Sequence, residues 1–511
     1  MRREAGAGLD AGLMVILAFS VFAFGSTSYW ARTLLMGGIA ALFASWWLCT
    51  ARSRPPVEFE PESRSRGVEI AGVRLRRSGL GVVAAAFGGI VCLQLVPLPR
   101  VVRGWLSPGR AALEVPLEAV LGESAAPEAG PSWAPLSLDA SGTVDALLLL
   151  LAYGALFVLV FNLADSRERL VRICRSVALL GASVAVVGLF QDLSGAERIY
   201  GFWTPRYGGS PYGPFVNHNH FAGYMELTIP VAVGLLLRRI FRGSAPPRAI
   251  AAAPPSGPGS AARRMLEVAP AVRGERAGQA VLLGLAVGVM VAALLLCLSR
   301  GGLASLVVAA AAVLALLALG GRLGRWEVAA LGAVLALGVT LFLWIGPGPA
   351  LAHFRRAELL QNEPSFLGRA SVWRATLSLF LDFPVLGSGF GTFPAAFLHY
   401  YPAGTERIWL QAHNDYVQLL AETGLAGAAV AAVGLALLLA HLLRPLILGP
   451  PVRERFLYFG LVTGILSLLV HSLVDFNLQI PANATLFVVL CALALAHRSL
   501  LARGERPAAE G

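Results

Sequence analysis

The feature that most limits how this chain can fold is a series of apolar runs, each about as long as a membrane is thick. A helix needs about 20 mainly apolar residues to cross the hydrocarbon core of a bilayer. Twelve runs approach this length, at residues 11–27, 32–50, 79–97, 144–163, 174–191, 221–240, 279–298, 303–320, 326–346, 423–443, 456–474 and 481–498. They predict an all-α polytopic membrane protein with about 12 transmembrane helices.

The composition agrees with this fold class and excludes several others. Of the 511 residues, 56% are hydrophobic and 14% are charged, whereas soluble proteins carry about 25% charged residues. The net charge of +11 is spread over many loops, so we expect no nucleic-acid partner. The five cysteines lie inside apolar runs without CxxC spacing, which indicates neither a disulfide framework nor a zinc site.

The placement of arginine predicts the orientation in the membrane. All 41 basic residues are arginines, and most lie in segments that become cytoplasmic if the N-terminus is inside. The first apolar run lacks a convincing cleavage site, so we interpret it as a span and not as a signal peptide. We therefore predict a multi-pass protein of the bacterial inner membrane, surrounded by membrane lipids, with both termini in the cytoplasm.

The same pattern divides the chain into regions. The predicted parts are an N-terminal transmembrane region of about nine spans at 1–346, an outer loop at 347–422, a C-terminal region of about three spans at 423–498 and a tail at 499–511. Two segments within the first region, near 51–78 and 241–277, have the polar or Pro- and Gly-rich composition of flexible cytoplasmic linkers. We expect the outer loop to contain short amphipathic helices and to carry the chemistry.

Two arginines begin the first predicted helix of the outer loop, GRASVWRATLSLFLD. Arg369, Trp373, Thr376 and Phe380 follow the spacing of one helical stripe, whereas Arg374 is rotated away from it. A guanidinium on an apolar face needs a partner, because an unpaired buried charge is costly. Arg369 can lie on lipid phosphate, or it can hold a substrate phosphate in a bidentate contact, with Arg374 as a second candidate for substrate binding.

A histidine opens the second predicted helix of this loop, in the sequence AHNDYVQLLAETG. The positive end of the helix dipole favours a neutral imidazole at His413, which is the form that a general base requires. The alternative is a structural role, in which His413 caps the helix or pairs with Asp415. Asn414, between them, is a candidate for substrate binding.

Ser299-Arg300-Gly301-Gly302 lies between two apolar runs and predicts a tight hairpin at the outer surface. An arginine at the end of a span is often a membrane anchor. Glycines next to an arginine, however, expose backbone N–H groups that can cradle an anion. Both interpretations of Arg300 remain open at this point.

Further polar residues flank the predicted spans. The cluster Asn217-His218-Asn219-His220 lacks a cysteine or carboxylate partner, so capping and hydrogen bonding to a sugar, through Asn217 and Asn219, are favoured over metal binding. His471 and Asp475 are four residues apart and either pair with each other or line the site. No P-loop, GxSxG, HExxH or DxD motif occurs, and Glu226 is the clearest charge within a span.

Five of these stretches together resemble the O-antigen ligase and Wzy-type polymerase superfamily. They are NHNHFAGYMELTIP, LSRGGLASL, GRASVWRATL with PVLGSGFGTF, AHNDYVQLLAETGLAG, and HSLVDFNLQIPANA. They occur in the family's order, and the resemblance extends over about residues 90–497. The resemblance implies a glycosyltransferase that receives a glycan on undecaprenyl diphosphate at the periplasmic face, without metal or nucleotide. It also implies two arginines on the diphosphate and a histidine near the acceptor, which here are Arg300, Arg369 and His413.

The resemblance leaves the acceptor open. The acceptor could be lipid A core, another glycan repeat or a protein hydroxyl, and we slightly favour a ligase. The reaction would belong to lipopolysaccharide or exopolysaccharide biosynthesis, with other polysaccharide-assembly proteins as partners. Two alternatives from other classes are a glycolipid exporter or flippase and a non-catalytic protein of an envelope complex. An exporter needs polar residues along a path through the bilayer, and the predicted spans supply few.

Overall fold

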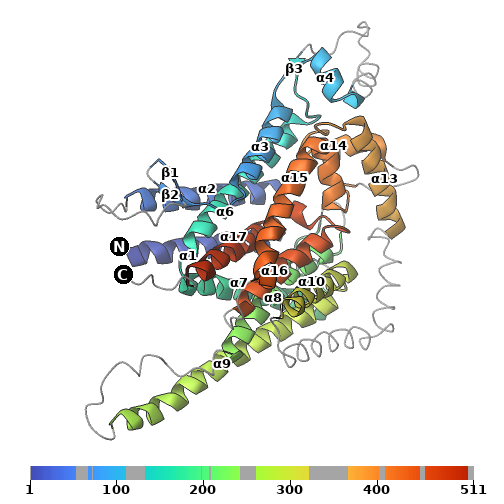
Figure 1. Ribbon diagram of the computed structural model, residues 1–511. Helices are drawn as coiled ribbons and strands as arrows, with labels where there is room; N and C mark the ends of the chain where they lie inside the picture. Colours follow the sequence, from blue (N-terminus) through green and yellow to red (C-terminus); the bar gives the residue numbers. More distant parts are fainter. Residues whose placement is uncertain are drawn as a thin grey trace.

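The structure of the protein is a computed structural model. It describes residues 2–52, 67–71, 73–110, 133–196, 198–205, 209–241, 260–321, 366–401, 409–448 and 455–504. Within these ranges the chain forms a bundle of long helices that carries a smaller group of short helices at one end (Figure 1).

Eleven helices coincide with eleven of the twelve apolar runs. They are α1 (Arg2–Phe22), α2 (Tyr29–Arg52), α3 (Gly81–Leu95), α6 (Ala140–Leu163), α7 (Arg167–Leu193), α8 (His218–Phe241), α9 (Ser260–Leu296), α10 (Arg300–Leu319), α15 (Asp415–Leu448), α16 (Phe456–His471) and α17 (Pro481–Gly504). In the described ranges, eight helices are long and apolar enough to cross a membrane, and α1, α3 and α16 hold shorter apolar helices. The run at 326–346 lies outside the described residues. The all-α polytopic membrane fold is thus confirmed.

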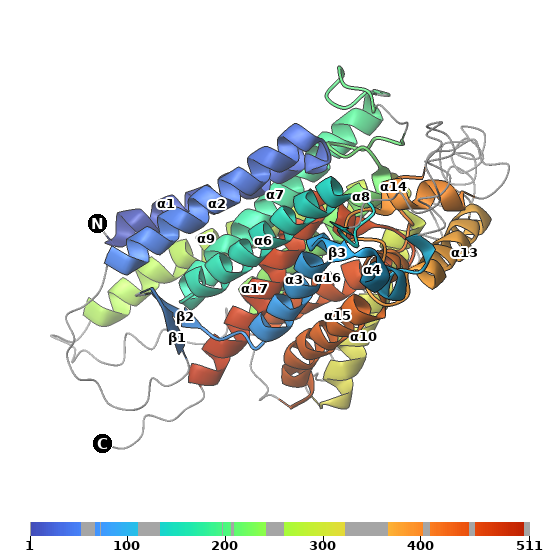
Figure 2. The same cartoon turned by 90° about the horizontal axis from the view of Figure 1, so that it is seen from above.

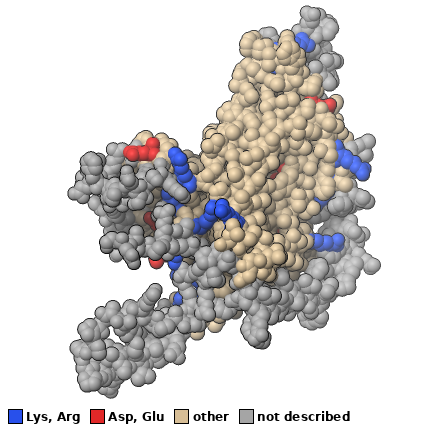
Figure 3. Space-filling model, viewed as in Figure 1, with Lys and Arg blue, Asp and Glu red and all other residues tan. Residues whose placement is uncertain are grey.

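The centre of the bundle is formed by α8, α16 and α17. In α8, 83% of the most apolar window is buried inside the protein, against 17% in α9. Small residues allow α8 and α16 to approach closely: a Cβ on Gly460 would lie 2.2 Å from the carbonyl oxygen of Pro230. Glycine at such crossings is typical of membrane helices, which associate by close packing. On the face that Figure 3 shows, charged side chains are sparse over the described part of the bundle.

The two predicted linkers differ from expectation where they are described. Residues 260–277 begin α9, because Ala, Arg, Leu, Met and Glu there favour helix over coil. In the other linker, β1 (Gly67–Ile70) and β2 (Val73–Arg76) form an antiparallel hairpin with Gly67 opposite Arg76. The remaining parts, 53–66 and 242–259, lie outside the described residues.

The short elements gather at the end of the bundle that lies away from both termini (Figure 2). They are α13 (Phe366–Asp382), α14 (Phe393–Ala396), η5 (Phe397–Tyr400), and α4 (Arg100–Leu106) with the two-residue strands β3 (Leu98–Pro99) and β4 (Trp133–Ala134). A further short helix, η7 (Asn477–Gln479), connects α16 to α17. The described parts of the predicted outer loop therefore form a folded cap on this end.

A buried polar network holds the glycine-rich turn between α13 and α14 against the bundle. Gln94, from α3, donates to the carbonyl oxygens of Leu386 and Glu422 and accepts from the N–H of Phe390. The carboxylate of Glu422, from α15, accepts the N–H groups of Gly391 and Phe393. These bonds satisfy backbone groups that the turn leaves unpaired.

Candidate functional site

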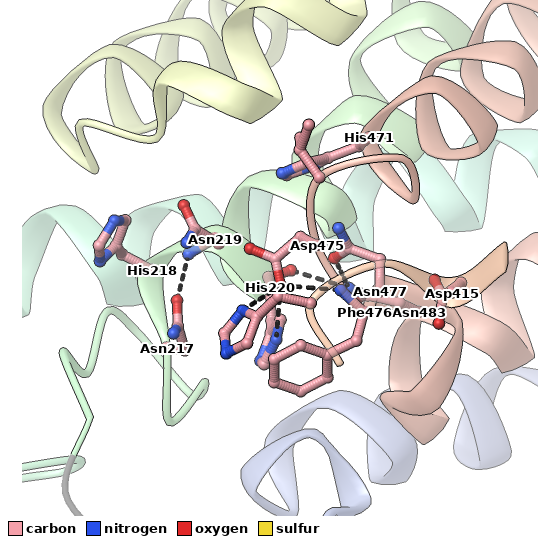
Figure 4. Close-up of polar contacts among 12 residues, drawn as sticks. Asn217, His218, Asn219, His220, Asp415, His471, Asp475, Phe476, Asn477 and Asn483 are labelled. Atoms are coloured by element: carbon pink, nitrogen blue, oxygen red, sulfur yellow. Dashed lines mark hydrogen bonds and ion pairs between the residues drawn. The ribbon is translucent and has the colours of Figure 1, made fainter. Parts of the chain in front are cut away.

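A fully buried carboxylate, Asp475, is the point at which the predicted site residues meet. Its Oδ1 lies 3.6 Å from Nδ1 of His413 and 3.8 Å from Nε2 of His220, and its Oδ2 lies 3.8 Å from a guanidinium nitrogen of Arg369. These three groups come from the loop before α15, from α8 and from α13. Figure 4 shows His220 directed at Asp475 from below the loop that carries the carboxylate.

The surroundings keep this carboxylate ionised. Burial on its own would raise the pKa of Asp475, but the interactions with His220 and His413 and the charge of Arg369 bring the pKa well below its ordinary value. The N–H of Phe476 also donates to Oδ1 at 2.8 Å. Asp475 is therefore a fixed negative charge that faces a histidine and an arginine.

The aromatic ring of Phe476 orients the two imidazoles. His413 and His220 each meet this ring edge-to-face, with centroids 4.7 Å and 4.6 Å away and interplanar angles of 88° and 75°. Edge-to-face contacts restrict ring orientation as well as distance. Both imidazoles are thus held with one nitrogen towards Asp475.

His413 has a strained backbone that its neighbours hold in place. Its φ of +53° lies in the left-handed region, which a residue with a side chain rarely adopts. The indole N–H of Trp373 donates to the carbonyl oxygen of His413 at 3.3 Å, and the preceding N–H, of Ala412, donates to Gln418 at 2.9 Å. Strain of this kind is found where a structure must present a side chain at one place.

The start of α15 shows where His413 lies relative to the helix. Asn414 is the cap: its Oδ1 accepts the N–H groups of Tyr416 and Val417, and its amide donates to the carbonyl oxygen of Leu473. His413 directly precedes this cap, and its Nδ1 lies 3.6 Å from Oδ1 of Asp475. Asp415 accepts the N–H of Leu478 and does not pair with His413.

α13 presents Arg369 to the same loop. Val372, Thr376 and Leu379 are buried on the inward face of the helix. Arg369 lies on this side and donates to the carbonyl oxygen of Val474 at 2.7 Å, whereas Arg374 is exposed on the outer side. The structure therefore brings Arg369 to the Asp475 cluster and leaves Arg374 outside it.

Arg300 is the exposed first residue of α10, and its turn packs against the loop that carries Asp475. The hydroxyl of Ser299 accepts the N–H of Gly302 and donates to Asn219 at 2.7 Å, which fixes the turn. A Cβ built on Gly301 would lie 2.9 Å from Nε2 of His471 and 3.5 Å from the side chain of Val474. The loop around Val474 thus separates the Arg300 turn from Arg369 and touches both.

Comparison with protein families finds a match within this chain. Residues 285–432 match the family Wzy_C, which is described as O-antigen ligase. The matched range, which we call the O-antigen ligase domain, is similar to this family. A comparison with curated proteins finds none that matches.

The O-antigen ligase domain contains Arg300, Arg369 and His413, but Asp475, the partner that Arg369 and His413 share, lies beyond it. Asp475 follows the matched range, and His220 precedes it. The site is therefore completed by α8 and by the loop after α16. The match confirms the resemblance that we inferred from the sequence.

The remaining predicted residues have mainly structural partners around the domain. Asn217 accepts the N–H of Asn219 at 2.7 Å and so begins α8, while Asn219 accepts the hydroxyl of Ser299. His471 does not pair with Asp475; its Nδ1 lies 2.7 Å from Oε1 of Glu226. In the described part of the chain, no group of three or more His, Cys, Asp or Glu side chains is arranged to hold a metal ion.

Sequence reasoning missed several residues that build the site around the ligase domain. His220 was noted only as part of a polar cluster, because α8 is buried on all sides and its spacing marks no inward face. Phe476 belongs to no sequence motif that predicts a place in the site. Gln418 lies within an amphipathic run, yet it joins the loop before His413 to Glu422.

Proposed function

We propose that this protein is an inverting membrane glycosyltransferase. It transfers a glycan from undecaprenyl diphosphate to an acceptor hydroxyl at the periplasmic face. The observation that carries this proposal is the convergence of His413 and Arg369, both within the O-antigen ligase domain, on the ionised carboxylate of Asp475. A base next to a fixed carboxylate, with a guanidinium close by, is suited to the displacement of an anionic leaving group.

The arginines account for the donor side of the reaction. Arg369 is held at Val474, and Arg300 is exposed on the turn that contacts the same loop. A diphosphate gains negative charge as its bond to the sugar breaks, and guanidinium groups stabilise such charge through paired hydrogen bonds. The two arginines supply this stabilisation without a metal ion or nucleotide.

His413 accounts for the acceptor side. Nδ1 faces Asp475, which leaves Nε2 to accept the proton of the acceptor hydroxyl, and the carboxylate stabilises the imidazolium that forms. The acceptor oxygen forms a bond to the anomeric carbon as the bond from that carbon to the diphosphate oxygen breaks. The bonding electron pair leaves with the diphosphate, and attack from the opposite face inverts the anomeric configuration.

The position of the site supports the periplasmic assignment. The cap formed by α13 and α14 lies at the end of the bundle opposite the termini (Figure 2), and the distribution of arginine favours cytoplasmic termini. We favour a ligase that glycosylates lipid A core over a polymerase that extends a glycan, in lipopolysaccharide or exopolysaccharide biosynthesis in the inner membrane.

Reconstitution tests this function. The purified protein in liposomes receives an undecaprenyl-diphosphate glycan and, in separate reactions, a lipid A core acceptor or a second glycan chain. We expect glycosylated acceptor from wild type and His399→Ala, and at least about a hundredfold less from His413→Ala, in line with the usual contribution of a general base. His399 is an exposed histidine of the same cap and so a matched control.

The outcome separates the alternatives. The acceptor that becomes glycosylated distinguishes ligase from polymerase. If no acceptor is modified while the lipid-linked glycan crosses the liposome membrane, the protein is an exporter and the proposal is wrong. Equal product from wild type and His413→Ala would likewise contradict it.

A further inference from the structure

A second ionisable pair lies deeper in the bundle and has no part in the reaction described above. Glu226 of α8 is fully buried, and its two oxygens accept from His471 at 2.7 Å and from Ser467 at 2.6 Å. His471 and Ser467 both belong to α16, so the contact joins the two central helices. Ionisable groups among membrane spans are costly and usually serve a function.

This pair packs directly against the turn that carries Arg300. A Cβ on Gly302 would lie 2.8 Å from Oε1 of Glu226, and one on Gly301 would lie 2.9 Å from Nε2 of His471. The two glycines that follow Arg300 are therefore required by the approach of these side chains. The sequence leaves open whether these glycines cradle an anion; in the structure they lie directly against the Glu226–His471 pair.

Other contacts show that the turn is held at a defined place. Leu298, two residues before Arg300, has a φ of +60°, which a leucine adopts only when its surroundings impose it. Ser299 caps α10 and is bonded to Asn219, near the start of α8. The turn is thus anchored to α8 on one side and to the Glu226–His471 pair on the other.

We propose that the Glu226–His471 pair positions Arg300 for the diphosphate of the donor. This inference rests on the proposed function and deepens it. The pair packs against Gly301 and Gly302 and so fixes the position at which α10 begins. This position in turn sets the direction of the Arg300 side chain. Glu226 and His471 are positioning residues, because they act through Arg300 and do not touch the reacting atoms.

The hydrogen bond between Glu226 and His471 also explains why this pair does not disturb donor binding. A lone carboxylate against the first turn of α10 would occupy its positive end and repel a diphosphate next to it. The imidazole of His471, bonded to Glu226, offsets this repulsion.

The test uses Glu226→Gln, which keeps the shape and most hydrogen bonds but removes the charge. In the reconstituted full-length protein we expect the KM for the lipid-linked donor to rise about tenfold or more, with a smaller change in the KM for the acceptor. Thr228→Val is the matched control, because Thr228 is buried on the same helix and its hydroxyl bonds only to backbone oxygens of α8. Its donor KM should equal that of wild type.

A double variant decides whether the effect passes through Arg300. If it does, Glu226→Gln has little further effect in an Arg300→Ala background, because the group that it positions is absent. Additive losses would overturn the inference. Amide hydrogen exchange of residues 298–303 provides a readout independent of activity: it should be faster in Glu226→Gln than in Thr228→Val, and equal protection in the two would also overturn it.

The two proposals can fail separately. Normal transfer by Arg300→Ala would contradict the role of Arg300 in the proposed function. Impaired transfer by Arg300→Ala together with a normal donor KM in Glu226→Gln would contradict only the positioning role of the pair.

Discussion

The substitution Asp475→Asn removes the charge at the centre of the site and leaves its shape. The side-chain oxygen of asparagine can still accept the N–H of Phe476, so the loop should keep its fold. At 3.6 Å and an effective dielectric constant of about 20, a carboxylate and an imidazolium attract each other by about 4 to 5 kcal/mol. Because His220 and Arg369 share this carboxylate, we expect about 2 to 3 kcal/mol of the stabilisation of the protonated His413 to be lost.

This loss corresponds to a decrease of about 30- to 150-fold in the rate of transfer. The assay measures kcat in liposomes at saturating donor and acceptor, with thermal unfolding as a check on folding. A smaller change in KM is expected, since the imidazolium forms only as the reaction proceeds. A folded Asp475→Asn variant with a rate within about fivefold of wild type, equivalent to about 1 kcal/mol, would refute the role of this carboxylate.

Three further predictions concern stability. The pKa of Asp475 is lowered on folding, so its stabilising contribution should be constant above its unfolded pKa of about 4 and decrease only as the pH falls below that value. The difference in melting temperature between wild type and Asp475→Asn, measured from about pH 5 to 8, checks this prediction. A difference that vanishes within that window would contradict it. Gly387→Ala should lower the free energy of unfolding by about 2 to 5 kcal/mol, because φ is +75° and a Cβ would lie 2.2 Å from the backbone of Glu422. Thermal unfolding compares this variant with Gly154→Ala, where a Cβ meets nothing within 4 Å. Equal melting temperatures of the two variants would contradict the prediction. Glu422→Gln should lower stability by about 1 to 3 kcal/mol, because an amide cannot accept both N–H groups that the carboxylate accepts; an unchanged unfolding transition would disprove this role.

The fold class could be predicted from the sequence because membrane spans obey a strong local rule. Each span must satisfy its own backbone and present apolar side chains over about 20 residues. The same rule cannot say which spans lie at the centre. α8 and α9 are both apolar in sequence, and only packing shows that α8 is enclosed whereas α9 is largely exposed.

The site could be predicted in part, for the same reason. Helical spacing placed Arg369 on the inward face of α13, since that is a local property. The partner of His413 could not be predicted, because Asp415 is its neighbour in sequence and Asp475 is its neighbour in space. Glu226 was recognised as unusual within a span, but its contact with the Arg300 turn depends on how α8, α10 and α16 pack.

The central claim is that residues from α10, α13 and the loop before α15 act in one reaction. The most direct test is the acceptor-dependent release of undecaprenyl diphosphate by wild type, Arg300→Ala, Arg369→Ala and His413→Ala, with Arg374→Ala as the control. We predict that each of the first three variants releases it at least about a hundredfold more slowly than wild type, whereas Arg374→Ala matches wild type. Release by any of those three within about fivefold of wild type, or an equal loss in Arg374→Ala, would contradict a single site of this composition.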